Sequence, residues 1–222
     1  MVAVSRRRAF NSAVTRFWSF AAPAYDAEAL QRWVYRPAHD EMISLLKAHH
    51  CDRIVDVGCG TGILAARIAE EVRPEEIYGV DFSEGMLTQA RNRSADVRWL
   101  TGPAEQLPFG DGSLDAALTT SAFHFFNQRA ALREFHRVLA PGGIAAVATF
   151  SPYQPFPSHC PVPSPLHWPG LSRFNPLHSP SPQTMRRLFI DAGFGLVDQH
   201  RVHRPLWTRP LSDLITVGVK SG

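Results

Sequence analysis

The feature that most constrains this chain is a block of closely spaced glycines between a short apolar run and a helical segment. The block reads Val-Asp-Val-Gly-Cys-Gly-Thr-Gly from Val55 to Gly62. The preceding run, Ile54 to Val57, is rich in β-branched residues and predicts a buried strand, whereas Ile63 to Val72 has helical spacing. Glycines at such a turn let the backbone pass where a Cβ would collide with a ligand, a strand or a helix. The block therefore predicts an α/β domain with a ligand site at this turn.

The same alternation continues along the chain. Further strands are predicted at Ile77 to Val80, Val97 to Leu100, Leu114 to Thr119, Ile144 to Phe150, Leu196 to His203 and Leu211 to Val219. Further helices are predicted from the Ser83 cap to Ala90, over Ala131 to Leu139, and from the Ser181 cap and Pro182 to a stop at Gly193. Alternation of this kind favours a Rossmann-like, doubly wound α/β fold, with a mostly parallel seven-stranded sheet and a C-terminal antiparallel strand.

Two segments depart from the alternation and set the predicted domain organisation. Residues 1–50 predict an N-terminal helical lid segment, in which two helices meet at Pro37. Residues 51–222 predict the core domain. Within it, residues 151–182 hold ten of the eighteen prolines and predict a long extended loop rather than a second domain.

Composition narrows the class of protein. With 222 residues and 45% hydrophobic content, the chain can bury one sizeable core. The three scattered cysteines argue against a disulfide framework and for a reducing compartment. Because no run is long and apolar enough to span a bilayer and no signal peptide opens the chain, we expect a cytoplasmic protein. The acid-free, arginine-bearing first 25 residues leave a mitochondrial transit peptide as the alternative.

The charge of residues 151–222 and the spacing of their histidines limit which binding partners can be expected. Residues 151–222 carry seven Lys or Arg against three acidic residues, which suits a solvated face, an anionic substrate or peripheral contact with a membrane. No basic and aromatic stripe predicts a nucleic-acid partner. His159, His167 and His178 match no compact metal motif, so no metal is predicted. The oligomeric state stays open.

The glycine spacing and one carboxylate limit which class of ligand can bind at this turn. The block has the spacing G-x-G-x-G, whereas a dinucleotide pyrophosphate calls for G-x-G-x-x-G. Asp81 ends the strand that begins at Ile77, where a carboxylate can accept both ribose hydroxyl protons. That placement suits NAD and S-adenosylmethionine alike, and the glycine spacing favours the ligand without phosphates.

Four segments in order resemble the motifs of class I S-adenosylmethionine-dependent methyltransferases. They read VDVGCGTG, GVDFSEGML, GPAEQLPF with DGSLDAAL, and LREFHRVLAPGGIAAV, and the resemblance covers residues 54–150. A short stretch from Phe20 to Asp26 is similar to the amino-terminal segment of ubiquinone- and menaquinone-pathway methyltransferases. The resemblance implies S-adenosylmethionine as cofactor and S-adenosylhomocysteine as product.

The resemblance also implies which residues hold the cofactor. They are Asp56, Gly58, Cys59, Gly60, Asp81, Phe82, Met86, Ala104, Glu105, Thr120 and Ser121. In this scheme Gly58 and Gly60 lie against the methionine portion, which Thr120 and Ser121 face, and Asp81 binds the ribose. Phe82 and Met86 enclose adenine, and Ala104 offers it a backbone N–H. For Met86 a plain core position is the competing interpretation.

Pro103 departs from the family pattern. Many relatives have an aspartate there that bonds the adenine amino group, and proline offers no side-chain donor or acceptor. We therefore expect Glu105 or Gln106 to hold adenine, or adenine to be held less tightly.

Two residues are candidates for the chemical step. In-line methyl transfer depends on alignment and desolvation, and it needs a base only when the nucleophile starts protonated. His124 follows the fourth predicted strand among phenylalanines and is the first candidate for a base or an acceptor-orienting group. Tyr25 is the second, on a segment that in similar enzymes closes over the cofactor. A purely structural role is the competing interpretation for both.

The sequence therefore predicts S-adenosylmethionine-dependent methyl transfer to an oxygen or carbon of a small, apolar or aromatic acceptor. Two alternatives stay open. Pro103 and the lack of an unmistakable base allow a non-catalytic S-adenosylmethionine-binding module. A nicotinamide-dependent oxidoreductase shares the ribose carboxylate, but the glycine spacing disfavours it.

Overall fold

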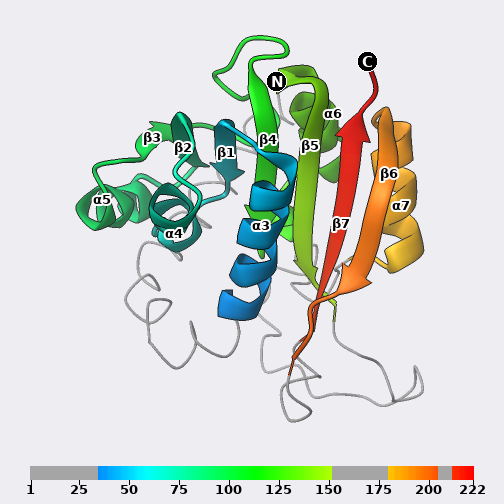
Figure 1. Cartoon of the computed structure of the whole chain (residues 1–222), viewed down its shortest axis with the longest axis horizontal. Helices are drawn as coiled ribbons and strands as arrows, with labels where there is room; N and C mark the ends of the chain where they lie inside the picture. The colour runs from blue at the N-terminus through cyan, green and yellow to red at the C-terminus, as the bar shows by residue number, and fades with distance from the viewer. Residues whose placement is uncertain (1–34, 152–179, 205–211) are drawn as a thin grey trace, which may run out of the picture.

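One sheet organises the molecule. The computed structural model describes residues 35–151, 180–204 and 212–222, and within these ranges seven strands pair in the order β3-β2-β1-β4-β5-β7-β6 (Figure 1). The strands are β1 Arg53–Val57, β2 Glu76–Asp81, β3 Arg98–Thr101, β4 Leu114–Thr120, β5 Leu139–Phe150, β6 Phe194–Arg201 and β7 Asp213–Lys220. β7 pairs antiparallel with both β5 and β6, and the pairs from β3 to β5 are parallel. The predicted mostly parallel sheet with one antiparallel C-terminal strand is confirmed.

Helices cover both faces of the sheet. They are α3 Arg36–His49, α4 Ile63–Glu71, α5 Glu84–Arg93, α6 Gln128–Val138 and α7 Pro182–Asp191, with a short 3-10 helix, η2, at Phe123–Phe125. The starts of α5 and α7 follow the capping signals in the sequence. The hydroxyl of Ser83 accepts a hydrogen bond from the Met86 N–H, and Ser181 caps α7 in the same way through Thr184.

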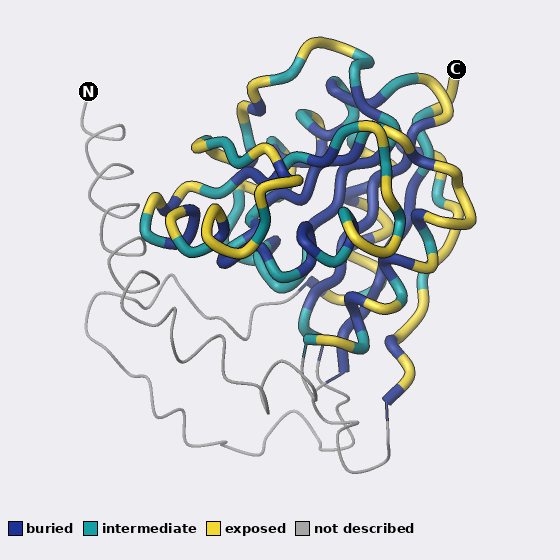
Figure 2. Tube along the Cα trace, turned by 60° about the vertical axis from the view of Figure 1, so that its left-hand side comes forward, coloured by how far each residue is buried: buried dark blue, intermediate teal, exposed yellow. Residues whose placement is uncertain are grey.

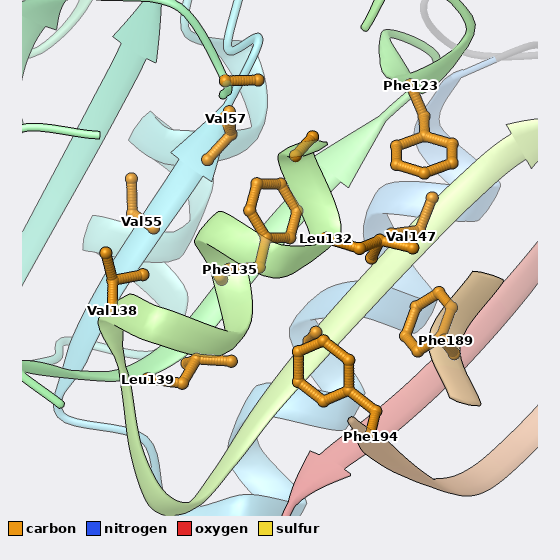
Figure 3. Packing of buried hydrophobic residues seen from close by; sticks show 14 of the residues in the cluster. Val55, Val57, Phe123, Leu132, Phe135, Val138, Leu139, Val147, Phe189 and Phe194 are labelled. Atoms are coloured by element: carbon orange, nitrogen blue, oxygen red, sulfur yellow. The ribbon is translucent and has the colours of Figure 1, made fainter. Parts of the chain in front are cut away.

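Two apolar cores lie on the two faces of the sheet, because the central strands bury both of their sides. Figure 2 shows these strands as the most deeply buried part of the tube. On one face α3 and α4 contribute Met42, Leu46 and Ile68. On the other, Phe135 of α6 and Phe189 of α7 pack with strand residues such as Val147 (Figure 3).

The predicted N-terminal segment is only partly described. Pro37 lies in the first turn of α3, which begins at Arg36, so the helix predicted after this proline is present. α3 packs against the sheet and belongs to the core just described. The helix predicted before Pro37 and the proline-rich loop, except its ends, lie outside the described residues.

A histidine connects α3 to the edge strand β6. His200 Nε2 lies 2.6 Å from Glu41 Oε2, and its Nδ1 lies 2.7 Å from Asp198 Oδ2. The backbone N–H of His203 also donates to Glu41, at 3.0 Å. Burial alone would lower the pKa of His200, but the hydrogen bonds to the two carboxylates outweigh it and raise the pKa.

This contact makes stability depend on pH. Because the pKa of His200 is raised in the folded protein, its contribution is complete below about 6.5, the usual value, and is lost as the pH rises through the folded-state pKa. We expect the stability difference between the parent protein and His200→Gln to shrink from pH 5.5 to pH 9 in urea unfolding. His203→Gln, at a residue that contacts Glu41 through its backbone, is the control. A difference that stays constant with pH would rule out this contribution.

Candidate functional site

The glycine turn after β1 closes against the end of β2. The backbone N–H groups of Gly58 and Cys59 donate to the carbonyl oxygen of Val80, at 2.7 and 3.2 Å. The N–H of Gly60 donates to Asp81 Oδ2 at 2.9 Å. The two segments that the sequence singled out are therefore in direct contact at the carboxyl edge of the sheet, where open α/β sheets bind ligands.

Two of the glycines of this turn have different surroundings. A Cβ added at Gly62, where φ is +78°, would lie 2.4 Å from the Trp99 ring and 2.9 Å from the Ala90 Cβ. A Cβ added at Gly60, where φ is +56°, would meet no atom of the described residues within 4 Å. Gly62 is thus required by packing between α4, α5 and β3, whereas Gly60 borders open space at the edge of the site.

Asp81 is held by backbone donors. Its Oδ1 accepts from the Ser83 N–H at 2.7 Å, and its Oδ2 accepts from Gly60. Burial raises the pKa of Asp81, and the backbone hydrogen bonds from Ser83, Gly60 and Phe82 counter part of that rise. A carboxylate has about four acceptor positions, so Asp81 keeps capacity for ligand hydroxyl protons.

Asp56 is a buried carboxylate beside Asp81. Its residue is 1% exposed, and among the described residues its Oδ1 has no hydrogen-bond partner. Burial and then the charge of Asp81 raise the pKa of Asp56 to about 7. A buried carboxylate oxygen without a partner is costly, and a cationic N–H donor from a ligand would satisfy it.

The residues predicted to enclose a base differ in exposure. The Phe82 side chain is exposed, at 45%, which leaves its ring free to cover a ligand. Met86 and Ala104 are buried, as the core interpretation of Met86 expects. Glu105 Oε1 accepts from the Asn127 N–H at 2.6 Å. The adenine contacts themselves stay predictions.

The end of β4 brings polar groups to the same edge. Ser121 adopts a φ of +55°, and its N–H donates to the carbonyl of Ala148 at 3.0 Å, which turns the chain directly after Thr120. His124 follows in η2, where its Nδ1 is buried and has no hydrogen-bond partner in the described part of the chain. Burial lowers the pKa of His124 to about 4, so the imidazole is neutral near pH 7. Tyr25 and the histidines of the proline-rich loop lie outside the described residues.

A family model described as a methyltransferase domain matches residues 55–147. The matched segment runs from the strand that precedes the glycine turn to β5. Over this segment the chain is similar to class I S-adenosylmethionine-dependent methyltransferases. The mostly parallel seven-stranded sheet and the glycine turn against Asp81 are the features that this resemblance led us to expect.

Individual curated proteins are also similar to the chain. A malonyl-[acyl-carrier protein] O-methyltransferase of Serratia marcescens is 31% identical over 64% of the chain and 54% of its own length. A demethylmenaquinone methyltransferase of Thermus thermophilus is 42% identical over 45% of the chain and 48% of its own length. The chain thus spans about half the length of the curated relatives it matches. The structure of a Synechocystis magnesium protoporphyrin IX methyltransferase with bound S-adenosylhomocysteine has a similar fold, with a TM-score of 0.67 at 17% identity over 99% of this chain and all of the other.

The sequence patterns did not reveal two features of the site. One is the unpartnered Oδ1 of Asp56, because burial within a strand does not reveal which atom lacks a partner. The other is a pair of α6 residues, Glu134 and Arg137, that bind the loop between β3 and β4. Their spacing of three on a helix was the available signal.

The described parts of the chain also give two negative findings. No group of three or more His, Cys, Asp or Glu side chains there is arranged to hold a metal ion. None of the helices there has the length and hydropathy that a bilayer span requires.

Proposed function

We propose that this methyltransferase transfers a methyl group from S-adenosylmethionine to an oxygen or carbon of a small, apolar or aromatic acceptor. The observation that carries the proposal is the pair of carboxylates at the glycine turn. Asp56 Oδ1 has no partner among the described residues, and Asp81 is fixed by backbone donors. The open space beside Gly60 gives the turn room for a ligand. These residues fit a nucleoside that carries an amino acid.

Each residue has a separate task in this proposal. Asp81 accepts the ribose hydroxyl protons, Asp56 accepts from the methionyl amino group, and the exposed ring of Phe82 covers adenine. When bound, the cofactor supplies an activated methyl group on a sulfonium. The chain's contribution is then to hold the reacting centres in line and to exclude water.

His124 is proposed to orient the acceptor. With a pKa of about 4 the imidazole is a weak base near neutral pH, and its buried, unpartnered Nδ1 suits a ring nitrogen that receives a hydrogen bond from an acceptor hydroxyl. The neighbouring Phe125 ring, whose centroid lies 4.0 Å from that of the imidazole, supports an apolar or aromatic acceptor.

The function is tested with labelled S-adenosylmethionine and a panel of phenols, quinols, carboxylic acids, amines and a malonyl thioester. The quinol and the thioester correspond to the acceptors named for the two relatives. We expect turnover with an oxygen or carbon acceptor, and we expect His124→Ala to lower turnover while S-adenosylhomocysteine binding is retained. Binding without any turnover would favour the non-catalytic module. Affinity for NAD without affinity for S-adenosylhomocysteine would refute the proposal.

Asp56 makes cofactor affinity depend on pH. Without ligand its pKa is about 7, and a bound ammonium group favours the ionised carboxylate. Affinity for S-adenosylhomocysteine should therefore be level above pH 7 and fall by up to about tenfold per pH unit below it, because binding must first remove the proton. Calorimetry of the parent protein at pH 6, in buffers of different ionisation enthalpy, should detect proton release. Asp56→Asn should bind more weakly and show a flat profile, whereas a parent protein that releases no proton would exclude this role.

A further inference from the structure

We propose that Glu134 and Arg137 of α6 are positioning residues that set selectivity for the adenine base. They act by holding the loop between β3 and β4, residues 102–113, in place. The inference rests on the proposed function, because it assumes that a nucleoside binds beside this loop. It extends that function to α6. Part of this helix lies in the fourth motif segment, but none of the cofactor contacts that the resemblance implies comes from it.

The loop has few internal hydrogen bonds of its own. The Gly102 N–H donates to the Asp81 carbonyl at 3.1 Å, which places the start of the loop next to the proposed ribose site. The Gln106 N–H donates to the Pro103 carbonyl at 3.2 Å and closes one turn. Because Pro103 has no side-chain donor or acceptor, a base at this turn must be recognised largely through backbone groups or through Glu105 and Gln106.

α6 supplies the contacts that fix the rest of the loop. Glu134 Oε1 accepts from the Leu107 N–H at 2.7 Å. The Arg137 guanidinium donates to the carbonyl of Leu107 at 3.3 Å, to the carbonyl of Phe109 at 2.9 Å and to Asp111 Oδ1 at 2.6 Å. One planar guanidinium therefore contacts three residues of the loop in a fixed geometry.

The two α6 residues also hold each other. Arg137 Nη2 and Nε donate to the two carboxylate oxygens of Glu134, at 2.6 and 2.9 Å. The hydrogen bond from Arg137 lowers the pKa of Glu134 despite partial burial, so the pair stays charged across the neutral range. A bidentate pair of this kind restrains both side chains, and it therefore also restrains the loop residues to which they are hydrogen-bonded.

The opposite side of the loop is held by burial and by a link to the acceptor end of the site. Ala104 and Leu107 are buried in the same apolar core as Phe135 of α6. Glu105 accepts from the N–H of Asn127, the residue that caps α6 and closely follows His124. The turn from Pro103 to Gln106 is thus held between apolar anchors and α6 charges, and its backbone can present donors and acceptors at fixed positions.

Fixed backbone groups are what base selectivity requires. A site built to hydrogen-bond one pattern of donors and acceptors rejects a ligand with the other pattern, because buried groups would then lack partners. Adenine and hypoxanthine have nearly the same shape and differ in hydrogen-bond pattern at ring position 6 and the adjacent N1. If Arg137 is removed, we expect the loop to lose its fixed position and the discrimination to fall, while stacking on Phe82 persists for either base.

The test compares S-adenosylhomocysteine with S-inosylhomocysteine, in which an oxygen replaces the adenine amino group. Affinities are measured by calorimetry for the parent protein, Arg137→Ala, Arg137→Lys and Arg133→Ala. Arg133 is an exposed arginine on the same helix and serves as the matched control. The parent protein should prefer the adenosyl ligand by at least about tenfold. Arg137→Ala should lose most of that preference, because its affinity for S-adenosylhomocysteine falls while its affinity for S-inosylhomocysteine is unchanged. Arg137→Lys should retain part of the preference, and Arg133→Ala should retain all of it.

Several outcomes would overturn the inference. They are an unchanged preference in Arg137→Ala, an equal loss of affinity for both ligands, and a parent protein that binds both ligands equally well. If Arg137→Ala does not fold, the ratio of the affinities for the two ligands is measured in Glu134→Gln instead. That variant keeps an acceptor for Leu107 but loses the charge that holds Arg137, so an unchanged ratio there overturns the inference. A parent protein that binds neither ligand would instead refute the proposed function.

Discussion

Replacing Asp81 with alanine is expected to weaken S-adenosylhomocysteine binding by about 100-fold, because two charge-assisted hydrogen bonds to the ribose are lost together. Such a pair is worth about 3 kcal/mol in the proposed geometry, and each 1.4 kcal/mol corresponds to roughly a factor of ten in affinity. Calorimetric titration of the purified variant measures the change. Unchanged affinity would remove the ribose assignment.

Because Asp81 also accepts hydrogen bonds from Gly60 and Ser83, its replacement could lower affinity by disturbing the glycine turn rather than by removing ligand contacts. Asp115 is a suitable position for a control substitution. Its carboxylate also accepts backbone N–H groups, those of Asp52 and Arg53, but it lies near the amino end of β4, at the opposite edge of the sheet. We expect Asp115→Ala to lower stability while leaving cofactor affinity intact. Asp81→Asn, which keeps one acceptor oxygen, should lose less affinity than Asp81→Ala.

The second large effect is expected at Gly62. Its alanine variant should lose about 4 kcal/mol of unfolding free energy, of which about 3 kcal/mol comes from overpacking and about 1 kcal/mol from the left-handed backbone. The physical cause is the Trp99 ring 2.4 Å from the added Cβ, with the Ala90 Cβ on its other side at 2.9 Å. Urea unfolding followed by circular dichroism measures the loss.

Gly60 provides the matched comparison within the same turn. It also has a positive φ, but an added Cβ would meet no atom within 4 Å in the part of the chain that the structure describes. Gly60→Ala should therefore lose only about 1 kcal/mol of stability, while its affinity for S-adenosylhomocysteine falls because the methyl group enters the space proposed for the ligand. Equal losses of stability in Gly60→Ala and Gly62→Ala would contradict the packing argument.

The sequence predicted most of the fold because each buried strand needed its own apolar run, and because Ser83 and Ser181 marked the starts of two helices. The errors lie at the ends of helices and strands. β5 begins at Leu139 rather than Ile144, because Leu139 pairs with Leu114 across an irregular register that no periodicity reveals. α6 begins at Gln128 rather than Ala131, and the capping side chain of Asn127 was a signal that the apolar pattern did not include.

In the candidate site, too, some contacts could be predicted from the sequence and others could not. The contact between Gly60 and Asp81 could be expected, because parallel neighbouring strands end at the same edge of the sheet. The contact between Arg137 and Leu107 could not, because it joins residues 30 positions apart through the packing of α6 on a loop without periodicity. The shifted pKa of Asp56 likewise depends on burial and on the distance to Asp81, which only the folded chain defines.

The reversed direction of β7 has a practical consequence. Since β7 runs against the other strands, it ends at Lys220, whose ammonium group donates to the carbonyl of Leu139 at the amino end of β5 (Figure 1). Gly222 therefore lies at the far edge of the sheet from Asp81, with open space around it. A biotin or resin attached at this end would anchor the domain to a sensor surface with its glycine turn directed toward the flowing solution, so that ligands could be titrated on the immobilised protein.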